Sequence, residues 1–160
     1  MEVRLLAVGR LKAGPERDLC ERYLERARKT GARLGLRGFS VKEVAESRAA
    51  RGEDRIAQEA EALIGLTGSS GRIVCLDAAG EALRSDEFAQ ALKRHAEASV
   101  PATTFIIGGA DGLGPAILGR ADLRLSFGRL TWPHQLVRVL LAEQLYRAMT
   151  ILSGHPYHRA

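Results

Sequence analysis

The sequence predicts a single α/β domain in which helices flank a mostly parallel sheet. Short apolar segments alternate along the chain with longer segments whose apolar residues recur at helical spacing. The chain has 160 residues, the length of one domain, and 46% of them are hydrophobic, enough to form a core. We find no internal repeat, linker or low-complexity segment. Residues 1–160 are therefore expected to form one unit.

Each expected helix begins at a recognisable start signal. Pro15 and Pro133 suit a first helical turn, and Ser85 suits an N-cap position. Glycines and polar residues separate the elements. In chain order we expect a strand at 3–9, a helix from Pro15 to Gly31, a strand at 34–44, a helix at 53–66, a strand at 72–77, a helix capped by Ser85, a strand at 103–107, a helix at 112–120, a strand at 123–127 and a helix at 133–153.

Composition limits the classes of protein to which the chain can belong. The formal net charge of +5 fits either a partner that is a polyanion or a surface that simply favours Arg. The two cysteines, Cys20 and Cys75, give no disulfide framework and no metal-ligand spacing. Neither a signal peptide nor an apolar run long enough to span a membrane is evident, so we expect a soluble cytoplasmic protein without a membrane partner.

Residues 108–114 contain four glycines and directly follow the apolar segment 103–107. Glycines between a strand and a helix let a ligand approach the backbone amides. A dinucleotide fold is not supported, because the loop follows a late strand, its spacing differs and no acidic residue ends the next strand. The loop is therefore either a structural tight turn or a ligand-binding loop.

Three strand ends are expected to meet at one edge of the sheet. They are Leu76-Asp77, Gly108-Gly109 and the segment 127–132. The carboxyl ends of parallel strands form the usual ligand crevice of α/β folds. The backbone of three such loops predicts a site for a flat ligand that is neutral or cationic.

The helix expected at 133–153 is apolar on more than one face. A surface helix normally shows one apolar stripe, so this helix is either enclosed or shared with a second chain, and we favour a homodimer. Glu143 and Arg147 have the spacing of an intrahelical ion pair, which is either structural or part of a pocket. The tail combines Tyr157, His158 and Arg159, which can stack on a base, titrate near neutral pH and bind an anion. No metal site is expected, because no Cys or acidic residue accompanies the histidines.

Residues 130–148 and the motif His155-Pro156-Tyr157-His158-Arg159 closely resemble the ribosomal RNA large subunit methyltransferase H family, part of the SPOUT superfamily of knotted methyltransferases. The glycine loop and the first strand also fit that family. The resemblance implies a SPOUT α/β fold with a C-terminal trefoil knot. It implies a homodimeric enzyme that transfers the methyl group of S-adenosylmethionine to N3 of a pseudouridine. The implied target lies in the helix 69 loop of 23S rRNA within the assembled 70S ribosome.

The resemblance also assigns residues to two sites. The catalytic residues that it implies are Arg147, Tyr157, His158 and Arg159, and the tail of one chain is expected to complete the pocket of the other. Arg147 or Arg159 would stabilise negative charge on the base, and His158 is a candidate proton acceptor. The residues that it implies for cofactor binding are Leu76, Gly108, Phe127, Gly128, Arg129, Leu130, Thr131 and Trp132. Two alternatives remain open: a non-catalytic ribosome-binding protein, and a SPOUT methyltransferase with another RNA target.

Overall fold

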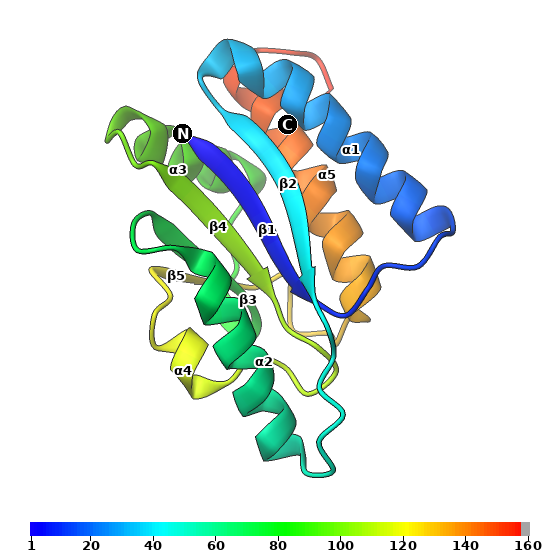
Figure 1. The fold of residues 1–160 in the computed structure, drawn as a ribbon. Helices are drawn as coiled ribbons and strands as arrows, with labels where there is room; N and C mark the ends of the chain where they lie inside the picture. The colour runs from blue at the N-terminus through cyan, green and yellow to red at the C-terminus, as the bar shows by residue number, and fades with distance from the viewer. Residues whose placement is uncertain (158–160) are drawn as a thin grey trace.

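The computed structural model describes residues 1–157 and shows a twisted sheet of five parallel strands (Figure 1). Strands that are distant in sequence pair in the middle of the sheet, in the order β2-β1-β4-β3-β5. The α/β class and the parallel sheet predicted from the sequence are confirmed. The strands are β1 (Glu2–Val8), β2 (Arg37–Val44), β3 (Arg72–Glu81), β4 (Ala102–Ile107) and β5 (Leu123–Leu125).

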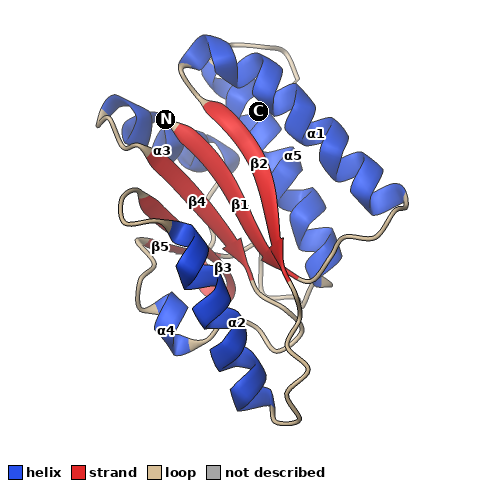
Figure 2. Ribbon diagram, viewed as in Figure 1, coloured by secondary structure: helices blue, strands red, loops and turns tan. Residues whose placement is uncertain are grey.

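Helices cover both faces of this sheet (Figure 2). One face packs against α1 (Pro15–Gly31), α3 (Ser85–Glu97) and α5 (His134–Leu152). The other packs against α2 (Gly52–Thr67) and the short α4 (Pro115–Leu118). A single 3-10 turn, η1 (Ala32–Leu34), connects α1 to β2.

Successive side chains of β1 point to opposite faces of the sheet, and the core therefore has two layers. Leu5 points into the layer of α1, α3 and α5, whereas Leu6 points into the layer of α2 and α4. Both side chains are fully buried because a strand inside a two-sided sheet has no solvent-facing side. All six residues of β4 are buried in the same way, and Phe105 packs its ring 5.8 Å from that of Phe88 on α3. The sheet is therefore a rigid platform for the loops at its edge.

Several boundaries differ from those expected. The segment 34–44 is not one strand, because Gly35 adopts a left-handed φ of 72° that ends η1 before β2 begins. The helix expected at 112–120 has only four residues, since its first part forms a tight turn. The N-cap of α3 is Arg84 rather than Ser85, whose hydroxyl instead donates to Gln144 on α5 at 3.0 Å.

The apolar helix α5 lies largely enclosed within its own chain. Leu141, Leu145 and Met149 are fully buried between the sheet and the neighbouring helices. The surplus of apolar residues that suggested a second chain is thus buried mostly by α1 and α3. Leu136, by contrast, is 39% exposed near the start of the helix.

No helix within the described residues is both long enough and apolar enough to cross a membrane. Across residues 1–157, no group of three His, Cys, Asp or Glu side chains is arranged to hold a metal ion.

Candidate functional site

The topology creates a crevice where β3, β4 and β5 end, which we call the carboxyl edge. From β3 the chain continues into α3 on one face of the sheet, whereas from the adjacent β4 it continues into α4 on the other. The two connections diverge and leave a gap between them. Such switch points are where open α/β sheets bind ligands.

A cavity of about 220 Å³ occupies this crevice, and we call it the edge cavity. Its walls come from the ends of β3 and β4, the loop after β5 and the first turn of α5. Seven of the eight residues expected to bind a cofactor line it, and they are Leu76, Gly108, Phe127, Gly128, Leu130, Thr131 and Trp132. Arg129 does not line it and is exposed instead. Asp77 and Gly109, expected at the strand ends that form the site, line it as well, and so do Leu113, His134 and Val137, which were not expected there.

The glycine loop forms one wall of the edge cavity as a tight turn. The amide of Gly112 donates to the carbonyl of Gly109 at 3.1 Å, and Gly112 has a φ of 83°. A Cβ at Gly108 would lie 2.8 Å from the backbone of Gly112, so only glycine allows the two strands of the turn to approach. The loop is thus a structural tight turn, and it also lines the edge cavity.

An ion pair ties this turn to α2. The guanidinium of Arg55 holds both carboxylate oxygens of Asp111, at 2.7 and 3.1 Å. The same guanidinium donates to the carbonyls of Ala49 and Ala50 in the loop before α2. The turn is thereby connected to two further segments, although the pair lies at the surface and adds little stability.

The loop after β5 is held by Ser126. The Ser126 hydroxyl accepts from the amide of Gly128 at 3.1 Å and lies 3.2 Å from the carbonyl of Ala78. Phe127, Gly128 and Trp132 also line a neighbouring cavity of about 450 Å³ that extends toward α3. This loop is therefore the common wall of two cavities.

Among the residues 1–157 that line the edge cavity, Asp77 is the one carboxylate. A hydrogen bond from the Ala79 amide and the adjacent Arg124 guanidinium lower the pKa of Asp77 below its usual range. Asp77 is therefore ionised at neutral pH, and Arg124 on β5 balances its charge. The nearby Cys75 is buried, which raises the pKa of its thiol to about 11 and leaves it unreactive.

Two of the expected catalytic residues lie together elsewhere, in a group we call the tail cluster: Tyr23, Glu143, Tyr146, Arg147 and Tyr157. The Arg147 guanidinium donates to Glu143 at 2.6 Å and lies 5.2 Å from the Tyr157 ring. The Tyr157 hydroxyl donates to the same Glu143 oxygen at 3.2 Å, and its ring packs 4.6 Å from that of Tyr146. The intrahelical pair expected for Glu143 and Arg147 is confirmed.

Burial and the neighbouring Tyr23 and Glu143 raise the pKa of Tyr157 above its usual range. The hydrogen bond to Glu143 likewise raises the pKa of Arg147. The tail cluster therefore presents a neutral phenol and a permanent cation at neutral pH. His158 and Arg159, the other two expected catalytic residues, lie outside the described residues.

The tail cluster and the edge cavity are separated within one chain. Val137 lines the cavity, and Arg147 follows it on α5 by roughly 15 Å at about 1.5 Å per residue. The structure thus brings seven expected cofactor residues together, and Arg147 with Tyr157, but it does not bring the two sets to one place.

In the sequence, Arg138 interrupts the apolar pattern of residues 133–153. In the structure Arg138 is 2% exposed and donates to Glu43 at 2.7 Å and to the carbonyls of Val8 and Gly9 at 2.6 and 2.5 Å. It therefore joins α5 to the ends of β1 and β2. A charged residue among buried positions was the signal in the sequence, but its partners could not be read there.

Comparison with known proteins places this architecture in a family. A model described as "Predicted SPOUT methyltransferase" matches residues 1–158. The chain is 53% identical to ribosomal RNA large subunit methyltransferase H of Rhodopseudomonas palustris strain BisA53 over the whole of both chains. It is 51% identical to the protein of that name from Bradyrhizobium sp. strain BTAi1, with the same coverage.

Solved structures agree on the fold. A probable methylase family protein from Haemophilus influenzae Rd KW20 superposes with a TM-score of 0.52 at 13% identity, covering 99% of this chain and 70% of that one. The family model and the full-length relatives are decisive. The chain belongs to the SPOUT methyltransferase family and, within it, to the ribosomal RNA large subunit methyltransferase H group.

Proposed function

We propose that this protein uses S-adenosylmethionine to methylate N3 of a pseudouridine in the helix 69 loop of 23S rRNA on the assembled 70S ribosome. The observation that carries the proposal is the edge cavity, lined by seven of the eight residues expected to bind the methyl donor. The names of the full-length relatives support ribosomal RNA of the large subunit as the substrate. The helix 69 target rests on the family resemblance.

The lining of the edge cavity fits S-adenosylmethionine. Leu130 and Trp132 offer apolar surface for a flat base, and Gly108 and Gly109 line the cavity without a side chain. The one negative charge noted in this lining, on Asp77, is balanced by Arg124, so the lining carries little net charge. When bound, this donor supplies a methyl group already activated by its sulfonium. The work left to the protein is alignment and the handling of charge and protons.

N3 of pseudouridine is a weak acid between two carbonyl groups. As its proton leaves, negative charge spreads to the flanking oxygens, and a fixed cation beside them stabilises it. In our proposal Arg147 or Arg159 supplies that cation, Tyr157 contacts the base and His158 accepts the proton. Arg147 suits the role because its partners Glu143 and Tyr157 hold the guanidinium in place.

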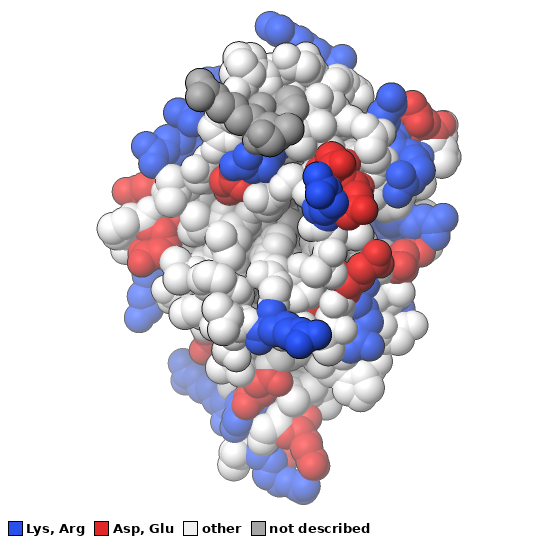
Figure 3. All heavy atoms as spheres, turned by 180° about the vertical axis from the view of Figure 1, so that it is seen from behind, with Lys and Arg blue, Asp and Glu red and all other residues white. Residues whose placement is uncertain are grey.

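We also propose that the working unit is a homodimer in which one chain's tail completes the partner's edge cavity. The separation of the tail cluster from the edge cavity within one chain supports this arrangement. Leu130, Trp132 and Leu136 are 73%, 40% and 39% exposed. Seen from behind, the middle of the face that carries α3 and α5 is formed mainly by uncharged side chains (Figure 3). The trefoil knot implied by the resemblance stays a prediction.

The test is mass spectrometry of 23S rRNA from a strain that lacks the gene, before and after the gene is restored. We expect N3 methylation of the helix 69 pseudouridine to disappear and to return. Persistence of that methyl group, with loss of another, would indicate a different RNA target. Calorimetry that detects no binding of S-adenosylmethionine, with or without ribosomes, would instead favour a non-catalytic ribosome-binding protein.

A further inference from the structure

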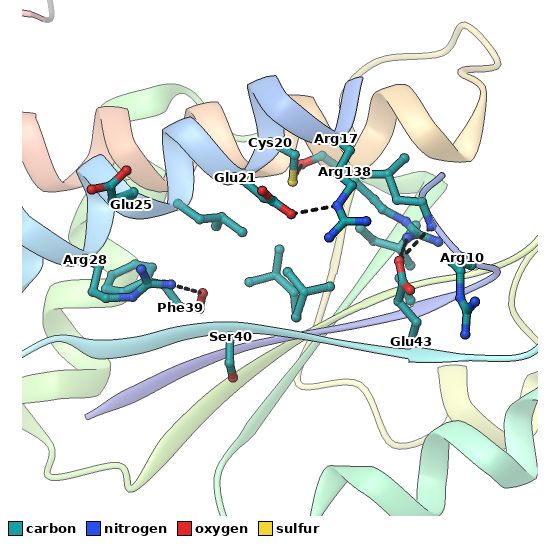
Figure 4. Close-up of a pocket in the computed structure, with 16 residues that line it drawn as sticks. Arg10, Arg17, Cys20, Glu21, Glu25, Arg28, Phe39, Ser40, Glu43 and Arg138 are labelled. Atoms are coloured by element: carbon teal, nitrogen blue, oxygen red, sulfur yellow. Dashed lines mark hydrogen bonds and ion pairs between the residues drawn. The ribbon is translucent and has the colours of Figure 1, made fainter. Parts of the chain in front are cut away.

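A second and larger cavity lies between α1 and the edge strand β2, and we call it the α1–β2 groove. Its volume is about 710 Å³. Leu5, Ala7 and Phe39 belong to its apolar floor, whereas charged side chains of α1, of β2 and of the turn after β1 form its walls (Figure 4). β2 is an edge strand, so no neighbouring strand covers this side of the sheet.

Each acidic side chain that lines the groove forms an ion pair with a Lys or Arg side chain of the protein. Glu21 pairs with Arg17 at 2.8 Å, and Glu25 pairs with Lys29 at 2.7 Å. Glu43 pairs with the buried Arg138 at 2.7 Å. The three carboxylates of the lining are thus neutralised within the protein. They leave little negative charge to repel an anion.

Two cations of the lining lack such a partner. Within the described residues, neither Arg10 nor Arg28 forms an ion pair with a carboxylate. The Arg28 guanidinium donates to the backbone carbonyls of Gly38 and Phe39, at 3.2 and 3.3 Å. These acceptors are uncharged, so they do not balance its positive charge. Arg138 lines the groove as well, and its buried Nε has no hydrogen-bond partner in the described structure. The groove therefore offers uncompensated positive charge at Arg10 and Arg28.

The surrounding segment concentrates the charge of the whole molecule. Residues 9–42, which span α1, η1 and most of β2, contain ten Lys and Arg against four Asp and Glu. The rest of the chain contains 14 Lys and Arg against 15 Asp and Glu. The basic character of the protein is thus a property of one region. Eight exposed cations of this region form no ion pair in the described part of the chain, among them Arg10, Lys12, Arg28, Arg33 and Arg37.

We propose that the α1–β2 groove binds the phosphate backbone of the substrate RNA, at a distance from the base that is methylated. This inference rests on the proposed function, because RNA is the polyanion that the enzyme must hold. Backbone contacts of this kind supply affinity and position the nucleic acid without reading its sequence. The part of α1 that lines the groove, from Arg17 to Arg28, spans roughly 17 Å at about 1.5 Å per residue, enough for more than one phosphate.

The groove leads to the proposed reaction site. Ile107, the last residue of β4, lines both the groove and the edge cavity. Arg138 in the groove directly follows Val137 in the edge cavity. RNA held along α1 and β2 would therefore run toward the carboxyl edge.

The test compares two double variants with a matched control. Arg10→Gln/Arg28→Gln removes the two lining cations that have no carboxylate partner, and Arg10→Gln/Arg17→Gln removes two at the end of the groove where α1 begins. The control, Arg94→Gln/Arg120→Gln, removes two exposed charges outside residues 9–42. Binding to a protein-free fragment of large-subunit ribosomal RNA is measured by fluorescence anisotropy at several salt concentrations, and S-adenosylmethionine binding is measured by calorimetry.

We expect each groove variant to bind RNA roughly tenfold more weakly, and its salt slope to fall by about 0.7–0.9 for every phosphate that the variant no longer neutralises. The control should match the wild type in RNA binding, and all variants should bind S-adenosylmethionine normally. Equal reductions in groove variants and control, or no reduction in either, would overturn the proposal. So would a loss of inorganic phosphate binding with RNA binding unchanged, because that result would indicate a site for small anions.

Failure of the proposed function would look different. If the wild type binds RNA through these residues but transfers no methyl group, the groove stands and the activity assigned above is wrong. If methyl transfer occurs and the salt slopes of the groove variants equal that of the control, the activity stands and the groove is wrong.

Discussion

At the scale of single residues, Arg138 shows how much one buried charge can connect. Its guanidinium links α5 to Glu43 on β2 and to two carbonyls at the end of β1. The Glu43 carboxylate also accepts from the Leu11 amide at 2.7 Å. The contact therefore fixes the end of β1, the edge strand and the connection between β1 and α1 relative to α5.

Replacing Arg138 by Met should strongly destabilise the protein. The change leaves Glu43 and two carbonyls without their donor, and breaking a buried pair in this way costs about 3–5 kcal/mol. Urea denaturation measures the effect. Arg17→Met, which removes an exposed ion pair, is the matched control and should change stability little. Similar unfolding midpoints for the two variants would contradict the role assigned to Arg138.

Gly108 is the residue on which the shape of the edge cavity depends most. A Cβ there would lie 2.8 Å from the Gly112 backbone, so Gly108→Ala must displace the turn. We expect its affinity for S-adenosylmethionine, measured by calorimetry, to fall at least tenfold while the protein stays folded. Gly65→Ala, in the last turn of α2 with no atom near its Cβ position, is the control and should be stabilised by up to about 1 kcal/mol. Normal affinity in Gly108→Ala would remove the turn from the proposed cofactor site.

At the scale of elements, the pairing of β3 with β5 shapes the carboxyl edge. Three residues of β5 pair with β3, and the Asp77–Arg124 ion pair reinforces the junction. So short a strand makes few ladder hydrogen bonds, and its position depends on such side-chain contacts. The loop that forms the wall between the two cavities begins directly after it.

This junction predicts a pH dependence of stability. The Ala79 amide and Arg124 lower the pKa of Asp77 in the folded state. A carboxyl group whose pKa is lowered by folding stabilises the folded state at pH values above its unfolded pKa of about 3.9. That stabilisation is lost as the pH falls through the pKa of the folded state. Urea denaturation between pH 7 and pH 3 should therefore show a smaller decrease in stability for Asp77→Asn than for the wild type. Arg124→Gln should also lose less stability than the wild type between pH 7 and pH 3. If both variants lose as much stability as the wild type, the role given to the Asp77–Arg124 pair is wrong.

At the scale of the whole molecule, the central fact is the separation of the edge cavity from the tail cluster. α5 contributes to both, but at opposite ends, and a straight helix cannot bring its ends together. In the proposed homodimer the second chain overcomes this separation, because its tail can lie against the edge cavity of the first chain.

Mixing two inactive variants tests this arrangement. Arg147→Gln impairs the tail cluster and Gly108→Arg blocks the edge cavity, so each homodimer should be inactive. If each site combines one cavity with the partner's tail, an equal mixture refolded together should regain about a quarter of wild-type activity. Half of the dimers would be mixed, and each mixed dimer would hold one intact site. A mixture that stays inactive, with mixed dimers verified by native mass spectrometry, would show that each site lies within one chain.

The sequence by itself determined the α/β class, the position of most elements and the location of the edge cavity. Hydrophobic periodicity is a local property, and parallel strands necessarily present their carboxyl ends together. The family motifs between residues 130 and 159 added the membership that the comparisons show. Seven of eight expected cofactor residues line one cavity for the same reason, since they follow three adjacent strands.

Only the tertiary structure decided which distant residues meet. Glu43 and Arg138 are 95 residues apart in sequence, and no local pattern pairs them. Arg129 turns to solvent although its neighbours line the cavity, because each side chain in an irregular loop points where the packing allows. Sheet order likewise placed β2 at an edge, opened a groove beside α1 and left the tail cluster remote from the edge cavity.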